Sequence, residues 1–307
     1  MGQVSGWALL AVLAAAPVSD RVWVSNWVSG NKVDPALMPG FHGSYDWSSP
    51  HAADTYAAEA FKRARTVKAT GGSELDGLRA GAEATLASKK AGDDDKRRAA
   101  QVLGWLQQPA SVPALAAAAG PDNPEAIDAL GRFGSAKSRA GFVVFGGMYD
   151  GQDLDPQPDP RATAALVALA ASPVPRVKRR ALRALVLHEG PDAEKAFTGA
   201  ATGCQLEALE WLEQHAITDR VKLLVACTSA PDAEARAAAV KALSTLGDRA
   251  QLPLFLKLLD DPDDGVFVAA HRALSKLEGF PGEPPSTSAH DRALLTPMWK
   301  KRLAAPH

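Results

Sequence analysis

Two stretches near the C-terminal end of the chain decide the fold: Asp232 to Leu246, DAEARAAAVKALSTL, and Asp263 to Leu277, DDGVFVAAHRALSKL. They are offset by 31 residues, and each begins with an aspartate directly after a proline, where it can cap a helix. Apolar residues then recur at intervals of three and four, which is the period of an amphipathic helix. A glycine, Gly247 or Gly279, follows each stretch as a helix stop. The two stretches therefore predict two copies of one helical unit.

The same unit recurs toward the N-terminus with decreasing clarity. Val177 to His188 keeps the full apolar spacing. Weaker copies keep only a leucine with an apolar residue three places on, and they lie at Leu103, Leu130 and Leu209. Second helices are expected at 110–119, 219–228 and 251–259. Because a single helix pair cannot bury both of its apolar faces, successive pairs must stack. The sequence thus predicts an all-α protein, with an α-solenoid of stacked helical hairpins over residues 92–279.

The segment PDAEARAAAVKALSTLGD, followed by LPLFLKLLDDPDDGVFVAAHRALSKL, resembles two consecutive HEAT repeats of the short bacterial type also found in phycobilisome lyases. The resemblance is strongest over residues 219–278, moderate over 92–218 and absent before residue 90. The sequence departs from the family at Phe267, where an arginine is usual, whereas Arg236 keeps the pattern. The resemblance implies a non-enzymatic scaffold that binds protein partners along a curved face. A less favoured implication is a lyase for a bilin-type chromophore, with Cys204 and Cys227 as its only candidate thiols.

Charge and cysteine content narrow the classes of function. The 34 basic and 35 acidic residues give a net charge of -1, which lacks the basic excess of a nucleic-acid-binding protein. We therefore expect a protein partner, no nucleic acid and no cofactor. Two cysteines are too few for an all-cysteine zinc site. A helical hairpin turning near Ala216 would bring Cys204 and Cys227 to similar heights, either as a disulfide or as two buried thiols.

The first residues bear on cellular location. Trp7 to Val18 is an uninterrupted apolar run, shorter than the about 20 residues that cross a bilayer. It fits the apolar region of a secretory signal peptide, although the preceding MGQVSG lacks a basic residue. We expect residues 1–19 to be a signal peptide, the mature chain to lack a transmembrane segment, and the protein to be periplasmic or secreted. The alternative is a buried apolar helix in a cytoplasmic protein.

Residues 20–91 do not follow the repeat pattern. Aromatic residues concentrate there, and we expect an irregular, aromatic-rich cap that covers the open end of the solenoid and contains a helix at 54–68. Four side chains in this segment could bind zinc or iron: His42, Asp46, His51 and Asp54. A metal-binding or hydrolytic protein is therefore the alternative to the scaffold. The simpler interpretation is that these side chains make turn and cap hydrogen bonds.

Basic residues crowd one of the predicted helices. They are Arg176, Lys178, Arg179, Arg180 and Arg183. Their clustering predicts either a docking ridge for an acidic partner or simply a solvated helix face. The remaining polar clusters have structural interpretations.

The acidic stretch 149–160 could bind calcium, but it does not carry the glycine and terminal glutamate at the positions of an EF-hand loop, and we expect a flexible insert instead. The aspartates at 260–264 are expected to cap helices, and His188 and His271 to be structural. Residues 280–307 are predicted to be a Pro/Ser-rich linker and a tail with a short amphipathic piece at 299–303. No catalytic residues are predicted.

Overall fold

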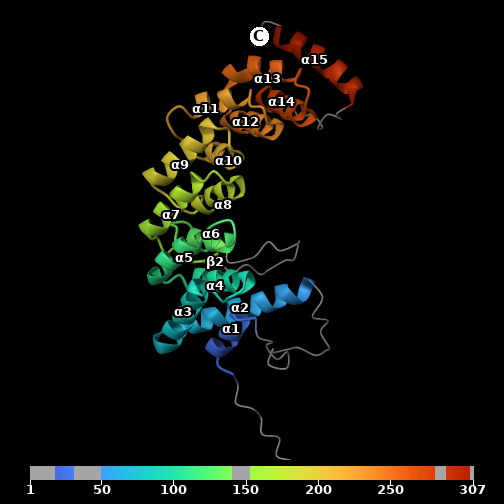
Figure 1. Cartoon of the computed structure of the whole chain (residues 1–307). Coiled ribbons are helices and arrows are strands. Elements are labelled where there is room, and N and C mark those ends of the chain that lie inside the picture. The colour runs from blue at the N-terminus through green and yellow to red at the C-terminus, as the bar shows by residue number, and fades with distance from the viewer. Residues whose placement is uncertain (1–17, 31–49, 140–152, 281–287, 305–307) are drawn as a thin grey trace, which may run out of the picture.

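The protein is an all-α solenoid in the computed structural model, which describes residues 18–30, 50–139, 153–280 and 288–304 (Figure 1). Helix pairs follow one another along the chain and stack in sequence order. The pairs are α3 (Gly72–Ala87) with α4 (Asp93–Leu106), α5 (Val112–Ala118) with α6 (Pro124–Gly131), α7 (Pro160–Ala170) with α8 (Pro175–Leu185), α9 (Pro191–Thr202) with α10 (Leu206–Gln214), α11 (Arg220–Cys227) with α12 (Ala233–Leu246), and α13 (Leu252–Leu258) with α14 (Asp264–Leu277).

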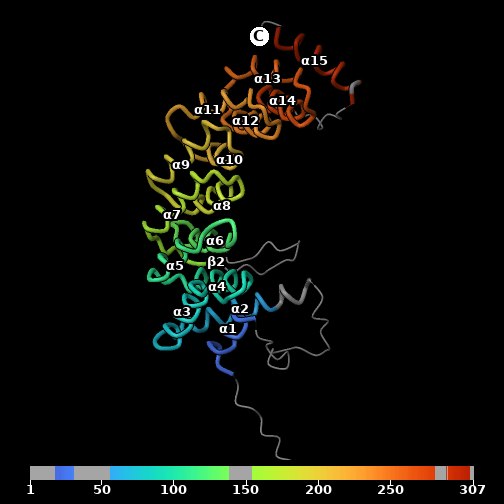
Figure 2. Tube along the Cα trace, in the orientation of Figure 1, coloured from blue at the N-terminus to red at the C-terminus, as the bar shows by residue number. Residues whose placement is uncertain are grey.

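The pairs form two curved layers. Figures 1 and 2 show α3, α5, α7, α9, α11 and α13 along the outer edge of an arc, and α4, α6, α8, α10, α12 and α14 along its inner, concave edge. Within the inner layer, each helix contacts the next one along the arc. Short 3-10 turns, η2 (Pro109–Ser111) and η3 (Arg249–Gln251), lead into α5 and α13. The predicted second helices at 110–119, 219–228 and 251–259 are confirmed by α5, α11 and α13 with these turns.

Small residues allow the inner helices to approach closely. A Cβ on Gly104 of α4 would lie 2.9 Å from the Cβ of Ala129 on α6, and one on Gly131 would lie 3.0 Å from the Cβ of Ala184 on α8. Larger side chains fill the rest of the core, and Trp105 of α4 is fully buried, with its ring against those of Trp27 and Phe61. The alanine-rich composition therefore serves close packing between neighbouring repeats.

The N-terminal cap differs from the irregular segment that the sequence predicted, because its described residues are largely helical. α1 (Asp20–Val28) and α2 (Pro50–Thr70) pack on α3 and α4. The helix expected at 54–68 is confirmed as part of α2. Aromatic rings join these helices: Trp23 stacks on Tyr56, and Trp27 stacks on Trp105 of α4. The aromatic concentration thus reflects helix packing rather than irregular backbone.

The C-terminal tail is also more helical than expected. α15 (Ala289–Ala304) runs well beyond the predicted piece at 299–303 and continues through Pro297. Its Trp299 is fully buried, with the ring centroid 5.8 Å from that of His271 on α14. α15 therefore covers the last repeat, as an open-ended array requires.

An insert separates the second helix pair from the third. β1 (Ser138–Arg139) and β2 (Asp153–Leu154) pair antiparallel, with Ser138 opposite Leu154. Part of the predicted acidic insert, up to residue 152, lies outside the described residues. At its end, the Asp159 carboxylate accepts a hydrogen bond from the Arg161 backbone and caps α7. None of the described helices combines the length and apolar character that crossing a membrane requires.

Candidate functional site

Helix α8 carries the predicted basic cluster, and its sequence divides it into two faces. Pro175 occupies the first turn, where its missing N–H costs nothing. The core face consists of Val177, Ala181, Leu182, Ala184 and Leu185, all buried. The opposite face, which points away from the core of the inner layer, consists of exposed residues spaced three or four apart: Arg176, Arg179, Arg183 and Val186. We call these four residues the arginine face.

Arg180 does not belong to the arginine face. Its guanidinium donates two hydrogen bonds, of 2.8 and 2.6 Å, to the Asp128 carboxylate of α6. Glu125 of the same helix lies 3.8 Å away. The interaction with Asp128 raises the pKa of Arg180 further above its ordinary value. Arg180 therefore joins two neighbouring repeats and is not available as a docking residue, which corrects that part of the predicted ridge.

Arg179 and Arg183 lie over a buried carboxylate on the next inner helix. The Arg183 Nε is 3.2 Å and the Arg179 Nε is 3.6 Å from Oε1 of Glu207 on α10. The Glu207 side chain is only 4% exposed, whereas those of Arg179 and Arg183 are 62% and 66% exposed. One carboxylate thus holds two guanidinium groups side by side, and most of each faces solvent. The pair keeps an excess positive charge on the concave side.

Arg176 and Lys178 complete the predicted cluster. Arg176 is exposed, and Lys178 is partly buried. Neither makes an ion pair or hydrogen bond with another of the described residues. Val186, which sequence reasoning missed, is 48% exposed and extends the face by one turn. Its three-residue spacing from Arg183 could have indicated this position.

The candidate metal ligands fall largely outside the structure's description. His42 and Asp46 lie in residues 31–49, and nothing is described of the side chains of His51 and Asp54 at the start of α2. In the described part of the chain, no three His, Cys, Asp or Glu side chains are grouped to hold a metal ion.

The two cysteines lie where α9, α10 and α11 meet. Cys204 precedes α10, Cys227 ends α11, and the structure joins their sulfurs in a disulfide with Cα atoms 5.5 Å apart. The bond connects the ends of the predicted hairpin around Ala216. This geometry fits the disulfide interpretation rather than the one with two free thiols.

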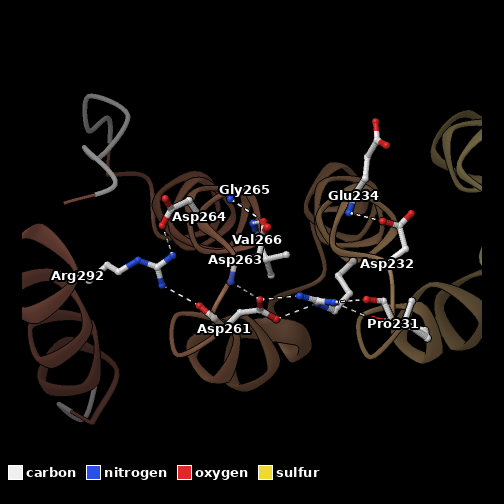
Figure 3. A network of polar contacts seen from close by, with 11 residues as sticks. Pro231, Asp232, Glu234, Asp261, Asp263, Asp264, Gly265, Val266 and Arg292 are labelled. Atoms are coloured by element: carbon white, nitrogen blue, oxygen red, sulfur yellow. Dashed lines mark hydrogen bonds and ion pairs between the residues drawn. The ribbon is translucent and has the colours of Figure 1, made fainter. Parts of the chain in front are cut away.

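The aspartates at 260–264 do more than cap helices (Figure 3). Only Asp263 caps α14, accepting hydrogen bonds from the backbone of Gly265 and Val266 at 2.8 and 3.2 Å. Asp264 accepts a hydrogen bond of 2.6 Å from Arg292 of α15, and Asp260 lies 3.3 Å from Lys300. The acidic run therefore holds the C-terminal helix as well as starting α14.

The contacts of Phe267 explain why the sequence departs from the repeat pattern at this position. The Arg292 guanidinium lies 4.4 Å from the centroid of the Phe267 ring, and it also donates a 2.7 Å hydrogen bond to the backbone oxygen of Asp261. An arginine supplied by α15 thus lies over the ring where the pattern usually has its own arginine. This is the last repeat, and α15 takes the place of a following one.

The two repeat histidines are buried as predicted. His188 Nδ1 lies 2.8 Å from the Thr163 hydroxyl oxygen, which links α7 to the end of α8. His271 packs under Trp299. Burial lowers the pKa of both imidazoles below the ordinary histidine value. Both are therefore neutral packing residues at pH 7.

Comparison with known families identifies the repeats. A family model described as HEAT repeats matches residues 202–275, and one described as PBS lyase HEAT-like repeat matches residues 95–120. Both segments are HEAT-like repeats. The first includes most of the region over which the sequence resemblance was strongest, and the second covers nearly all of α4 and the whole of α5. No curated protein sequence matches this chain significantly.

Two solved structures have similar helical chains. One is titled "Kap95p Binding Induces the Switch Loops of RanGDP to adopt the GTP-bound Conformation"; it is 13% identical, with a TM-score of 0.36. That match covers 94% of this chain but only 32% of the other, so this chain spans about a third of that chain's length. The second, titled "Crystal Structure of Engineered Protein", is 20% identical with a TM-score of 0.25, and the match covers 73% of this chain and 92% of that one.

Proposed function

We propose that this protein is a non-enzymatic HEAT-like scaffold that binds an acidic segment of a protein partner through the arginine face of α8. The observation that carries the proposal is the pair Arg179 and Arg183, held over the buried Glu207 with most of each side chain exposed. Curved arrays of helical repeats offer extended concave surfaces for binding. In this protein the arginine face adds positive charge to such a surface.

The arginine face has the properties of a docking site. Arginine presents a planar fork of donors that fits a carboxylate, and its weak hydration lowers the cost of binding. Arg176, Arg179 and Arg183 lie within eight residues of helix, and the seven steps from the first to the last span roughly 10 Å at about 1.5 Å per residue. Val186 adds an exposed apolar group at the end of the same face. The matching partner segment has several carboxylates one helical turn apart and an apolar residue beyond them.

Charge reversal tests this proposal. Arg179→Glu together with Arg183→Glu, made in a Glu207→Gln background so that no buried carboxylate is left without its partners, removes the cations that face solvent and leaves the Arg180–Asp128 pair intact. We expect the double variant to bind its partner at least about ten-fold more weakly, because it places like charges against the acidic segment. The measurement is retention of partner proteins from an extract of the native host on immobilised wild-type and variant protein. Bound proteins are identified and their affinities measured.

A matched control separates this effect from a change in net charge. Lys195→Glu together with Lys222→Glu makes the same change on α9 and α11, in the outer layer, where both lysines are exposed. We expect this variant to bind as wild type does, and raised salt to weaken binding by wild type. Equal loss in both double variants, or no loss in either, would contradict the proposal.

We further infer that the protein is exported to an oxidising compartment, periplasmic or extracellular. The apolar run Trp7 to Val18 supports this location. The disulfide between Cys204 and Cys227 also supports it, because such bonds persist in oxidising compartments. N-terminal sequencing of the protein from its native host tests the inference. A mature N-terminus between residues 15 and 20 would support export, and an intact Met1 would contradict it.

A further inference from the structure

Arg132, directly after α6, is a buried cation with no counter-ion among the side chains that the structure describes. The residue is 8% exposed, and its Nε is buried with no hydrogen-bond partner. No carboxylate of the described residues lies within ion-pair distance of its guanidinium. The charges of Asp128 and Arg180 act on its pKa in opposite directions, and these two residues bind each other. The acid that could neutralise Arg132 is therefore already engaged.

The surroundings of Arg132 are built to hold the side chain in place. A Cβ on Gly104 of α4 would lie 3.2 Å from Arg132 Nη1, so the glycine leaves room for the guanidinium. The Gln107 amide donates a 2.8 Å hydrogen bond to the Arg132 backbone oxygen. The same amide accepts a 2.9 Å hydrogen bond from Nζ of Lys68, a second cation from α2. Gln107 thus links Lys68 of α2 to the backbone at Arg132, at the end of α6.

A buried guanidinium of this kind lowers the stability of the fold unless a negatively charged group binds it. An arginine remains charged at neutral pH, and a buried charge without a partner destabilises a fold strongly. Structural arginines elsewhere in this chain are paired: Arg180 with Asp128, and Arg236 with Asp261. Arg132 departs from that pattern. Among the described residues it has no such partner, and a group that binds it would carry negative charge.

We propose that Arg132 forms an anion-binding site for a small oxyanion, a carboxylate or phosphate group, at the end of α6. The guanidinium fork supplies parallel donors to two oxygens of the anion. A small anion fits better than a partner side chain, because only 8% of Arg132 remains exposed. This site is separate from the arginine face, so either proposal can fail without the other.

Thermal unfolding with added anions tests the site. The purified full chain is unfolded in millimolar sodium phosphate, sodium acetate or sodium chloride at equal ionic strength, at concentrations too low for general salting effects. We expect phosphate or acetate to raise the Tm of wild type by about 3 °C above its value in chloride. The Arg132→Met variant should lose that difference while unfolding in chloride at the same or a higher temperature, because methionine removes the uncompensated charge.

Control variants decide the outcome. Arg176→Met makes the same charge change at an exposed residue and should keep the full anion effect. Arg132→Gln provides a second test should the methionine variant fail to fold. Equal Tm values of wild type in phosphate, acetate and chloride would overturn the proposal. An anion effect that persists in Arg132→Gln would also overturn it, and so would unfolding of both Arg132 variants at much lower temperature, since the guanidinium would then be structurally compensated.

Discussion

The guanidinium of Arg236 on α12 donates two hydrogen bonds, each 2.9 Å long, to the two carboxylate oxygens of Asp261 in the following repeat. The side chains are 14% and 9% exposed, so the pair is largely shielded from water. Arg236 also donates to the backbone oxygens of Ala230 and Pro231, at 2.9 and 3.1 Å. One side chain thus fixes the angle between two stacked hairpins.

Removing this arginine should destabilise the C-terminal repeats. We expect Arg236→Ala to lower the free energy of unfolding by about 3 kcal/mol, because Asp261 would remain buried without its partner. Chemical denaturation, monitored by circular dichroism, measures this decrease in the free energy of unfolding. Lys241→Ala is the control, since its ion pair with Glu213 has a lysine that is 69% exposed and should contribute less than about 1 kcal/mol. Similar losses in the two variants would contradict this account.

The buried histidines predict how stability depends on pH. Burial lowers the folded-state pKa of His188 and His271 below the unfolded value of about 6.5. Their contribution to stability is therefore complete above pH 6.5 and is lost as the pH falls toward the folded pKa values, because the unfolded chain binds protons first. We expect the Tm to fall between pH 7 and pH 5, and the fall to be smaller in a His188→Gln, His271→Gln double variant. An identical pH profile in that variant would refute the assignment.

The disulfide should contribute measurably to stability. It closes a loop with a sequence separation of 23 residues, for which a cross-link contributes about 3 kcal/mol. We expect the Cys204→Ser, Cys227→Ser variant to unfold at lower denaturant concentration than the oxidised wild type, and reduced wild type to match the variant. Mass spectrometry of the unreduced protein gives a direct check. Two free thiols in protein from the native host would show that the bond does not form.

Trp299 should hold the C-terminal helix in place. The side chain is fully buried, and truncation of such a tryptophan costs about 3–5 kcal/mol. Because α15 covers only the end of the array, we expect Trp299→Ala to release this helix locally and leave the distant repeats intact. Hydrogen exchange should accelerate in α14 and α15 and stay unchanged in α4 and α6. Uniform acceleration along the chain would instead indicate that the solenoid unfolds as one unit.

Local periodicity was sufficient to predict the repeats. In Asp232 to Leu246, the aspartate cap and the apolar spacing are complete within one helix, and α12 begins at Ala233 and ends at Leu246. The same holds for α14, where Asp263 caps the helix as its position after a proline predicted. Each of these features depends on residues within a few positions of one another. The sequence therefore contains all the information that the prediction needs.

Contacts between distant segments could not be predicted from local periodicity. The sequence could not show that Arg180 turns toward Asp128 on α6 while Arg183 lies over Glu207 on α10, because the partners are separated by long stretches of chain. Trp27 likewise meets Trp105 only after α1 folds against α4. The arginine face differs from the predicted basic cluster because Arg180 pairs with Asp128 on α6, which only the structure shows.

The measurement that tests the binding proposal most directly is photo-crosslinking in the native host. A photoreactive amino acid is placed at Val186, on the arginine face, or at Lys195, on the outer layer. We predict a crosslinked partner protein from position 186 and not from position 195, with the crosslink lost when Arg179→Glu and Arg183→Glu are added. A partner captured from position 195 but not from 186, or a crosslink from 186 that survives the charge reversal, would contradict the proposal.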